Sequence, residues 1–386
     1  MSFFQDNLSK QLQMQIDTDK KYLFYPNEIP KKNNLEKYLP NSYPISTRGS
    51  SRYFSKPIEW FSSLISELKK AKKFIFLQFF SISPGIMWEE IFNILKLRKN
   101  EGVEVRIIYD NLISASKLPK DFSNQLNQIG ILCQPYYQKN RLIGILNNHH
   151  LHRKVVIIDG KIAFTGGMNI GDEYLNLMKP YGIWQDVGIS LTGNSIWNFT
   201  VMFLSVWNTL ANTKEDYWKY YPKIKKENYS STYLVYGDNP LNNTRISENL
   251  FCSLIDRAKN SIDIYTPYFI PTKKLIQSFI GAKKRKVKVT IILPGIPDKK
   301  IIYFLTKQYA LFLKDNFFDI YFYHEGFIHG KVLLVDKTIA SIGNVNLDYY
   351  SLHYNFEYNI LLEEESTIKS ILKDIKEIKN HSQKWE

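Results

Sequence analysis

The feature that most constrains this chain is a pattern of 18 residues that occurs twice. The first copy, HRKVVIIDGKIAFTGGMN, runs from His152 to Asn169, and the second, HGKVLLVDKTIASIGNVN, runs from His329 to Asn346. In both copies a lysine follows the histidine by two positions and an aspartate follows it by seven. Identical internal spacing argues against incidental polar residues on a half-exposed strand. We therefore expect one structural unit that is used twice.

The segments before the two motifs repeat as well. Residues 64–80 and 250–269 each read as an amphipathic helix that runs into a strand, and residues 102–111 and 286–295 each contain a further strand. This alternation predicts an α/β fold with helices packed on a sheet. Because the unit is long and occurs only twice, two pseudo-symmetric lobes are expected rather than a solenoid.

The repeat also predicts domain boundaries. We expect an irregular N-terminal extension over residues 1–50, packed on a first lobe over residues 51–212, then a connector over residues 213–245 and a second lobe over residues 246–386. At 386 residues the chain exceeds the usual size of a single core, which agrees with two lobes. Each lobe is predicted to hold a mixed β-sheet flanked by helices.

Within each motif, strand alternation places the histidine and the lysine on one face: His152 with Lys154, and His329 with Lys331. Such a pair combines a nucleophile or proton carrier with a fixed positive charge. If the lobes meet across a pseudo-two-fold axis, both pairs face a single cleft. The two copies are therefore predicted to form two halves of one site.

Such a cleft suits phosphodiester chemistry, in which negative charge lies on non-bridging oxygens. Lys154 and Lys331 are predicted to bind these oxygens without help from a metal or another cofactor. One histidine attacks phosphorus, and the other protonates the leaving oxygen and then deprotonates the incoming alcohol or water. Further hydrogen-bond donors are expected from two amides and from glycine-rich backbone: Asn169, Asn346, Gly166, Gly167 and Gly343.

The motif H-x-K-x4-D, followed by G-G/S-x-N, resembles in both copies the signature of the phospholipase D superfamily. A finer resemblance to bacterial cardiolipin synthases extends over about residues 56–365 and is carried by IAFTGGMNIGDEY (162–174), TPYFIP (266–271), LPGIPDKK (293–300) and GNVNLDYYSLHYNFE (343–357). The resemblance implies phosphatidyl transfer through a phosphohistidine. One phosphatidylglycerol loses glycerol to form a phosphatidyl-enzyme, and a second phosphatidylglycerol attacks to give cardiolipin.

The resemblance also implies residue roles. It makes His152 the nucleophile and His329 the acid/base, although the symmetry of the motifs alone allows the reverse. It assigns Asp186 as the carboxylate partner of His152 and Glu357 as that of His329. Such partners set the tautomer of a catalytic histidine.

The same resemblance gives Asp159 and Asp336, the aspartates of the two signatures, a mainly structural role. The chain departs from the cardiolipin synthase pattern at Gln185, Gln78 and Asn344, where Arg, an acidic residue and Ser or Thr are usual. It also lacks the pair of N-terminal transmembrane helices of many bacterial members. The departures remove no catalytic group, but they leave substrate detail open.

Charge and apolar patterning bear on location and partners. Lys and Arg outnumber Asp and Glu by 51 to 37, and a net charge of +14 favours nucleic acid, an anionic membrane surface or phosphate-bearing substrates. The longest apolar stretch, residues 196–211, is interrupted by polar residues and is predicted to be a buried helix. Only Cys133 and Cys252 are present, which favours a reducing compartment and buried apolar thiols.

We therefore expect a cytoplasmic enzyme that binds peripherally to a membrane rich in phosphatidylglycerol, with no obligatory nucleic acid. Residues 301–315 form either a core helix or a membrane-facing amphipathic helix, and the aromatic residues of this segment are candidates for lipid contact. His149 and His150 are expected to be solvated loop side chains rather than metal ligands. The oligomeric state is left open.

Two other functions compete with phosphatidyl transfer. A phosphodiesterase of the same superfamily, either a nuclease or a phospholipase, would use water as the acceptor, and the net charge of +14 permits it. A non-catalytic lipid-binding module is disfavoured because both motif sets are complete.

Overall fold

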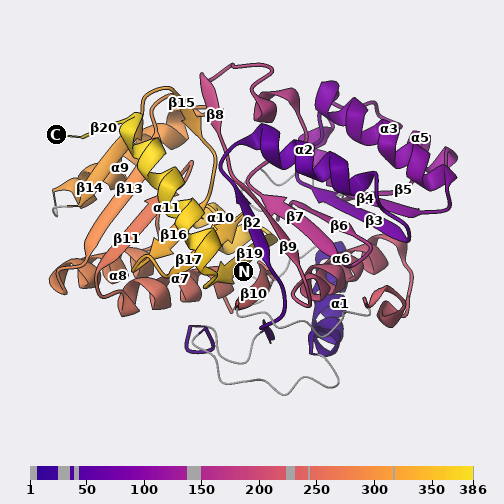
Figure 1. Ribbon diagram of the computed structural model, residues 1–386, viewed down its shortest axis with the longest axis horizontal. Coiled ribbons are helices and arrows are strands. Elements are labelled where there is room, and N and C mark those ends of the chain that lie inside the picture. The colour runs from indigo at the N-terminus through magenta and orange to yellow at the C-terminus, as the bar shows by residue number, and fades with distance from the viewer. Residues whose placement is uncertain are drawn as a thin grey trace.

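Two mixed β-sheets, each with helices on its outer face, form two lobes that lie side by side (Figure 1). The computed structural model describes residues 7–24, 35–38, 43–136, 149–222, 231–241, 244–315 and 318–385. The first lobe is drawn in indigo to magenta and the second in orange to yellow, so each lobe is built mainly from one half of the chain.

The first lobe contains a seven-stranded sheet. Its elements are β2 (Ser51–Phe54), α2 (Pro57–Leu68), β3 (Phe74–Phe79), α3 (Ile86–Asn100), β4 (Glu104–Asp110), α4 (Asn111–Ser114), α5 (Phe122–Gln128), β5 (Leu132–Tyr136), β6 (Val155–Ile158), β7 (Ile162–Gly166), η1 (Asp172–Leu175), β8 (Ile183–Gln185), β9 (Gly188–Thr192), α6 (Ile196–Ala211) and η2 (Tyr217–Tyr220). The order is β2-β9-β7-β6-β3-β4-β5, and β3, β4 and β5 are parallel.

The second lobe contains a nine-stranded sheet. Its elements are β10 (Tyr233–Asp238), α7 (Ile246–Arg257), β11 (Ser261–Tyr265), β12 (Phe269–Ile270), α8 (Lys273–Lys284), β13 (Lys288–Pro294), α9 (Lys300–Lys314), β14 (Asp319–Tyr323), β15 (Gly326–Ile328), β16 (Val332–Val335), β17 (Ile339–Gly343), β18 (Leu347–Asp348), α10 (Tyr349–Tyr354), β19 (Glu357–Leu362), α11 (Glu365–Asn380) and β20 (Ser382–Lys384), joined by β1 (Ile45–Ser46). The order is β1-β10-β19-β17-β16-β11-β13-β14-β20.

The central strands of the two sheets repeat one plan. The run β19-β17-β16-β11-β13-β14 has the same sequence of antiparallel and parallel pairs as β9-β7-β6-β3-β4-β5. Strands β6 and β16, which follow the two histidines, occupy equivalent places. The prediction of two pseudo-symmetric α/β lobes with mixed sheets is confirmed.

The inner faces of both sheets share one hydrophobic core. Phe76 and Ile157 of the first sheet lie in the same buried cluster as Val235 and Ile360 of the second, and side chains of α6 and α11 fill the space between them. Separate clusters beneath α2 and α3, and beneath α7 and α8, cover the outer faces. Burial of a common core holds the lobes in one orientation, and this orientation brings the two motifs together.

Helix α6 confirms the predicted buried helix over residues 196–211. Its polar side chains are buried because each finds a hydrogen-bond acceptor inside the protein. Asn198 Nδ2 donates to the carbonyl oxygen of Val235 at 3.0 Å, and the Thr200 and Ser205 hydroxyls donate to carbonyl oxygens four residues earlier on the helix. The polar residues that interrupt the apolar stretch therefore belong to a protein core.

Two of the expected boundary regions contain regular structure. Within the expected irregular extension, α1 (Asn7–Leu23) packs on α6, with Leu12 and Leu23 in the shared core. Within the expected connector, residues 233–238 form β10, which pairs with β19 of the second sheet. The polar composition of the extension concealed α1, because only one face of this helix is apolar. Strand β10 is buried on both faces.

Candidate active site

The two motifs meet at the starts of β6 and β16. His152 and Lys154 immediately precede β6, and His329 and Lys331 precede β16. All four side chains are buried. Each lysine Nζ donates to the carbonyl oxygen of the histidine two residues before it, over 2.8 Å from Lys154 to His152. Burial is the main cause of the lowered pKa of His152, and Lys331 and His329 contribute to it across the lobe boundary, so the two pairs share one site.

Each histidine is hydrogen-bonded to a carboxylate from the other lobe. His152 Nδ1 lies 2.8 Å from Glu357 Oε2, and His329 Nδ1 lies 2.7 Å from Asp186 Oδ2. The predicted pairs, Asp186 with His152 and Glu357 with His329, were therefore wrong, because the two carboxylates are exchanged between the lobes. Both carboxylates are fully buried.

The exchange follows from two short parallel pairings that cross the lobe boundary. Strand β15 runs beside β8, with Ile328 opposite Gln185, and the next residues along the two strands are the histidine and the aspartate of one dyad. Leu151 bridges Phe356 in the same parallel sense, and the next residues are the other histidine and the glutamate. In a parallel pairing, the residues that follow a matched pair are also neighbours. Each dyad therefore contains one residue from each lobe.

Asp159 and Asp336 hold equivalent hairpins and form no contact with the dyads. The Asp159 carboxylate accepts hydrogen bonds from the backbone N–H groups of residues 72–74 at 2.7–3.2 Å. The Asp336 carboxylate accepts the same set from residues 259–261 at 2.6–3.2 Å. Each aspartate therefore ties its hairpin to the start of a neighbouring strand, as the structural role predicts.

The glycines expected to present N–H groups to a phosphate are used mainly for close packing. A Cβ on Gly167 would lie 2.0 Å from Asp186 Oδ1, and the Gly167 N–H donates to the Val187 carbonyl oxygen at 3.1 Å. Cβ atoms on Gly166 and Gly343, which belong to β7 and β17, would lie within 2.3 Å of the neighbouring strands. Gly167 thus makes room for a dyad, and its N–H is already engaged.

The two motif asparagines differ in how they are held. Asn169 Oδ1 accepts from the Ser81 N–H at 3.2 Å, and its Nδ2 donates to the Tyr174 hydroxyl at 2.9 Å. Asn346 lines a cavity beside His152, and its buried Oδ1 has no hydrogen-bond partner among the described residues. Of the two predicted amides, Asn346 is therefore the better placed to contact a substrate.

Asn344 joins the two motifs directly, a role that the sequence reasoning missed. Its Oδ1 accepts from the Lys154 N–H at 3.0 Å, and its Nδ2 donates to the carbonyl oxygen of Gly166. The only signal in the sequence was a departure from the usual Ser or Thr inside the second motif. The longer amide side chain supplies an acceptor and a donor that bridge the lobes next to Lys154.

The two dyads differ electrostatically. Burial alone would raise the pKa of Asp186, but His329, Lys331 and the Val187 N–H together hold it below its usual value. Burial raises the pKa of Glu357 well above its usual range, against the opposing effects of Lys154 and hydrogen bonds from Ser351 and Asn355. The dyad of the second motif therefore holds the more strongly ionised carboxylate.

Burial lowers the pKa values of the two histidines and the two lysines of the site. Burial, with a smaller contribution from Lys331, lowers the pKa of His329 to about 4, and burial together with Lys154 lowers that of His152 well below its usual value. Burial lowers the pKa of Lys154 to about 7 and that of Lys331 to about 8, although the dyad carboxylates act in the opposite direction. Neutral histidines beside ionisable lysines suit nucleophilic attack on an anionic phosphodiester.

A cavity of about 360 Å³ opens beside His152. Its lining is mostly apolar and aromatic and comes from both lobes: Phe80, Ile113, His150, Tyr268, Ile270, Lys299, Ile302, Asn346, Asp348, Tyr349, Tyr350 and Asn355. An apolar cavity beside a dyad and two lysines suits a ligand that has both an apolar and an anionic part.

His149 and His150 are held within the protein, so the expectation of solvated side chains was wrong. His149 Nδ1 lies 3.0 Å from the Tyr354 carbonyl oxygen, and His150 Nδ1 lies 3.2 Å from Asp110 Oδ2. Both are partly buried because α10 packs against this segment. Across the described ranges, no group of three or more His, Cys, Asp or Glu side chains is arranged to hold a metal ion.

Neither the apolar helix α6 nor any other helix in the described part of the chain combines the length and apolar character needed to cross a membrane. Cys133 and Cys252 are both free and buried, as predicted. Burial raises the pKa of each thiol, which fits apolar packing rather than reactivity.

Comparison with known proteins identifies relatives that match both lobes. The family described as "Cardiolipin synthase, PLD-like domain" matches residues 64–183 and 251–379, one stretch in each lobe. Cardiolipin synthase of Listeria welshimeri is 32% identical over 93% of this chain and 75% of its own length. Cardiolipin synthase 2 of Bacillus anthracis is 33% identical over 86% of this chain and 65% of its own length.

An uncharacterised protein of Streptococcus mutans is 36% identical over 91% of this chain and 77% of its own length. Among solved structures, phosphatidylserine synthase of Haemophilus influenzae aligns over 87% of both chains with a TM-score of 0.63 at 14% identity. Polyphosphate kinase of Porphyromonas gingivalis aligns over 91% of this chain and half of its own with a TM-score of 0.56. These two structures share the fold.

Proposed function

Because this chain belongs to the cardiolipin synthase family of the phospholipase D superfamily, we propose that it makes cardiolipin from two molecules of phosphatidylglycerol and releases glycerol. The observation that carries the proposal is the pair of buried His–carboxylate dyads that meet at one site beside two lysines. Two reacting groups and two cations are what a double displacement at a phosphodiester requires.

In the first step, His152 Nε2 attacks phosphorus and the bond from phosphorus to the glycerol oxygen breaks. The bound phosphodiester anion raises the pKa of His329, so that His329 acts as an imidazolium held by Asp186. Its Nε2 gives a proton to the glycerol oxygen, and glycerol leaves. In the second step, a hydroxyl of another phosphatidylglycerol loses its proton to His329 and attacks phosphorus, which breaks the bond to His152. The ionised Asp186 stabilises the imidazolium of His329, which supports the acid/base role of His329 and the nucleophilic role of His152.

The lysines supply the remaining contacts with the phosphate, and Asn346 contacts the headgroup. Lys154 and Lys331 are close enough to both dyads to neutralise the non-bridging oxygens as charge builds up in the transition state. A bound phosphodiester anion would also raise the pKa of both lysines and keep them charged. The unpaired Oδ1 of Asn346 would accept a hydrogen bond from a headgroup hydroxyl and so fix the orientation of the headgroup.

Helix α9 supports peripheral binding to the cytoplasmic face of an anionic membrane. Thr306 and Leu313 pack inward, while Ile301, Phe304 and Phe312 are 77%, 61% and 45% exposed. The start of this helix contributes Ile302 to the cavity beside His152, so its apolar surface adjoins the way into the site. Insertion of these side chains, with attraction between lysines and anionic lipid, would place the cavity at the headgroups.

The direct test incubates the purified chain with phosphatidylglycerol vesicles and analyses the products. Cardiolipin and glycerol in equal amounts are expected, and a variant with His152→Ala should form neither. Phosphatidic acid without cardiolipin would show that water is the acceptor and would replace the transferase proposal with a phospholipase. Cleavage of single-stranded DNA in a parallel incubation, without lipid turnover, would replace it with a nuclease.

Vesicle flotation tests the membrane proposal. Binding to phosphatidylglycerol vesicles should weaken at high salt, and binding to zwitterionic vesicles should be weak throughout. Phe304→Ser with Phe312→Ser should remove most of the binding that survives high salt, whereas Leu97→Ser, at a side chain 59% exposed on α3, serves as the matched control. Equal binding to both vesicle types would contradict the proposal.

A further inference from the structure

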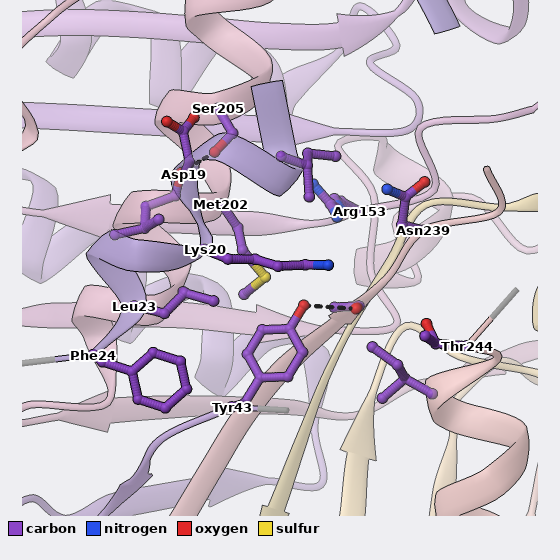
Figure 2. A pocket seen from close by; sticks show the side chains of 14 residues that line it. Asp19, Lys20, Leu23, Phe24, Tyr43, Arg153, Met202, Ser205, Asn239 and Thr244 are labelled. Carbon is purple, nitrogen blue, oxygen red and sulfur yellow. Dashed lines mark hydrogen bonds between the residues drawn. The ribbon is translucent and has the colours of Figure 1, made fainter. Parts of the chain in front are cut away.

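A second cavity, of about 230 Å³, lies at the lobe boundary between α1, α6 and the end of β10 (Figure 2). Its lining includes Arg153, whose side chain is only 2% exposed. Arg153 Nη2 donates to the Asp238 carbonyl oxygen at 3.3 Å, but Nε and Nη1 have no hydrogen-bond partner among the described residues. Unsatisfied donors on a buried guanidinium are costly, so a ligand that accepts from both would stabilise this state.

The repeated catalytic unit has no need of this arginine. Strand alternation turns Arg153 away from the face of His152 and Lys154 and toward the core between the sheets. The second motif has Gly330 at the equivalent position, where a Cβ would lie 2.6 Å from the ring of Tyr265. The second motif therefore packs an aromatic ring where the first has a guanidinium and a cavity. The positive charge of Arg153 is not part of the repeated unit and needs a separate explanation.

The chemistry of the cavity favours an anion. Lys20, half exposed and in a surface ion pair with Asp17, adds a cation, and Figure 2 shows it across the same space from Arg153. Two carboxylates lie close by. Asp238 interacts electrostatically with Arg153 and accepts from the Ser247 N–H at 3.1 Å, and Asp19 lines the cavity and accepts from the Tyr217 hydroxyl at 2.6 Å. Neither carboxylate is hydrogen-bonded to Arg153 Nε or Nη1, so an acceptor-rich ligand would satisfy donors that these acids leave unpaired.

We propose that this cavity is a second, non-catalytic anion site that takes a phosphate group on Arg153. The phosphate is carried either by a lipid headgroup or by a soluble phosphate. Its volume lies below the range of about 300–1,000 Å³ typical of sites for drug-sized molecules, so a phosphate or a glycerophosphate fits and a whole diacyl lipid does not. The apolar side chains of Leu23, Phe24 and Met202 would cover the carbon part of an ester.

The position of Arg153 couples this site to catalysis. Its guanidinium lies 4.5 Å from the ring centroid of Tyr358, the residue after Glu357, and its backbone lies between His152 and Lys154. A phosphate held by Arg153 would therefore restrain both partners of the first dyad from the opposite face. Occupancy would regulate the turnover of the first motif rather than take part in it.

The test uses full-length protein with His329→Ala and Lys331→Ala, which weakens phosphate binding at the catalytic site, and measures inorganic phosphate binding by titration calorimetry. One phosphate per chain should remain bound. Arg153→Met should weaken it at least tenfold, and Met202→Phe, which fills the cavity, should do the same. Lys20→Ala should weaken it two- to fivefold, whereas Lys21→Ala, on the same helix but outside the cavity, should change nothing.

Thermal unfolding in the absence of phosphate identifies any variant that fails to fold. If Arg153→Met fails to fold, phosphate binding by Met202→Phe, and the difference between Lys20→Ala and Lys21→Ala, test the proposal instead. Absence of residual binding, or equal binding to the parent and to Met202→Phe, would overturn the proposal. Tighter binding of glycerol 3-phosphate or monomeric short-chain phosphatidylglycerol than of inorganic phosphate would assign, respectively, a soluble ester or a lipid headgroup. Because the protein used is catalytically inactive, this outcome is independent of the proposed reaction.

Discussion

The two motifs share a backbone plan but differ in what surrounds each histidine. The first dyad contains Glu357, whose pKa is raised by burial, and the second contains Asp186, whose pKa is held down by its cationic neighbours. Behind the first motif lies Arg153 with a cavity, and behind the second lies Gly330 with a packed Tyr265 ring. Duplication kept the geometry of the reacting groups while their electrostatic environments diverged. The difference favours distinct chemical steps for the two histidines.

The largest expected effect comes from removing either histidine. His152→Ala and His329→Ala should each lower turnover by at least about 1,000-fold, because each serves a different step of one reaction. Acid quenching of the wild-type enzyme with labelled phosphatidylglycerol, followed by peptide mass spectrometry, should place the phosphoryl adduct on His152. An adduct on His329 would reverse the assignment, and more than a few per cent activity in both variants would refute a shared site.

The second largest effect is expected from the two dyad carboxylates, whose removal should lower kcat by different amounts. Asp186→Asn removes an ionised partner and should lower kcat by roughly 100-fold or more. Glu357→Gln removes a carboxylate whose pKa is raised by burial, and it should lower kcat by about 10-fold. NMR of the histidine rings tests the exchange of partners, since Asp186→Asn should shift the resonances of His329 and leave those of His152 nearly unchanged. A larger loss from Glu357→Gln would contradict the electrostatic difference.

The lysines should set the alkaline side of the pH profile. Lys154, with a pKa of about 7, and Lys331, with a pKa of about 8, lose their charge as pH rises, so kcat/KM should fall by up to about tenfold per pH unit above these values. On the acid side, activity should persist below the usual pKa of histidine, because the nucleophile, His152, stays neutral. Lys154→Arg should move the alkaline limb to higher pH, and an unchanged limb in this variant would exclude Lys154.

The smallest effect concerns stability behind the second motif. The Asp374 carboxylate is buried and accepts from the hydroxyls of Tyr53 and Tyr265, and burial raises its pKa to about 7. Since the folded state binds this proton more tightly than the unfolded state, stability should fall as pH rises from about 4 to about 7. Urea unfolding at pH 5 and pH 8 measures how much the free energy of unfolding falls between these pH values. Asp374→Asn should reduce this fall by roughly 1–3 kcal/mol. An identical dependence in both proteins would contradict the assignment.

Much of the fold and four members of the candidate site could be predicted from the sequence, because their signals are local. Helix and strand periodicity, read twice along the chain, predicted the two mixed-sheet lobes, and the spacing inside each motif identified His152, Lys154, His329 and Lys331. The polar interruptions of α6 correctly indicated a buried helix, since each small polar side chain can bond to its own or a neighbouring backbone.

The tertiary structure alone decided how the halves combine. Whether His152 meets Asp186 or Glu357 depends on which strands run side by side across the lobe boundary, and no local pattern contains that register. The bridge formed by Asn344 and the cavity beside Arg153 likewise join segments far apart in the sequence. Such contacts arise only when hydrophobic burial between the two sheets fixes their orientation, so the sequence specifies the reacting groups locally and the shared core sets their partners.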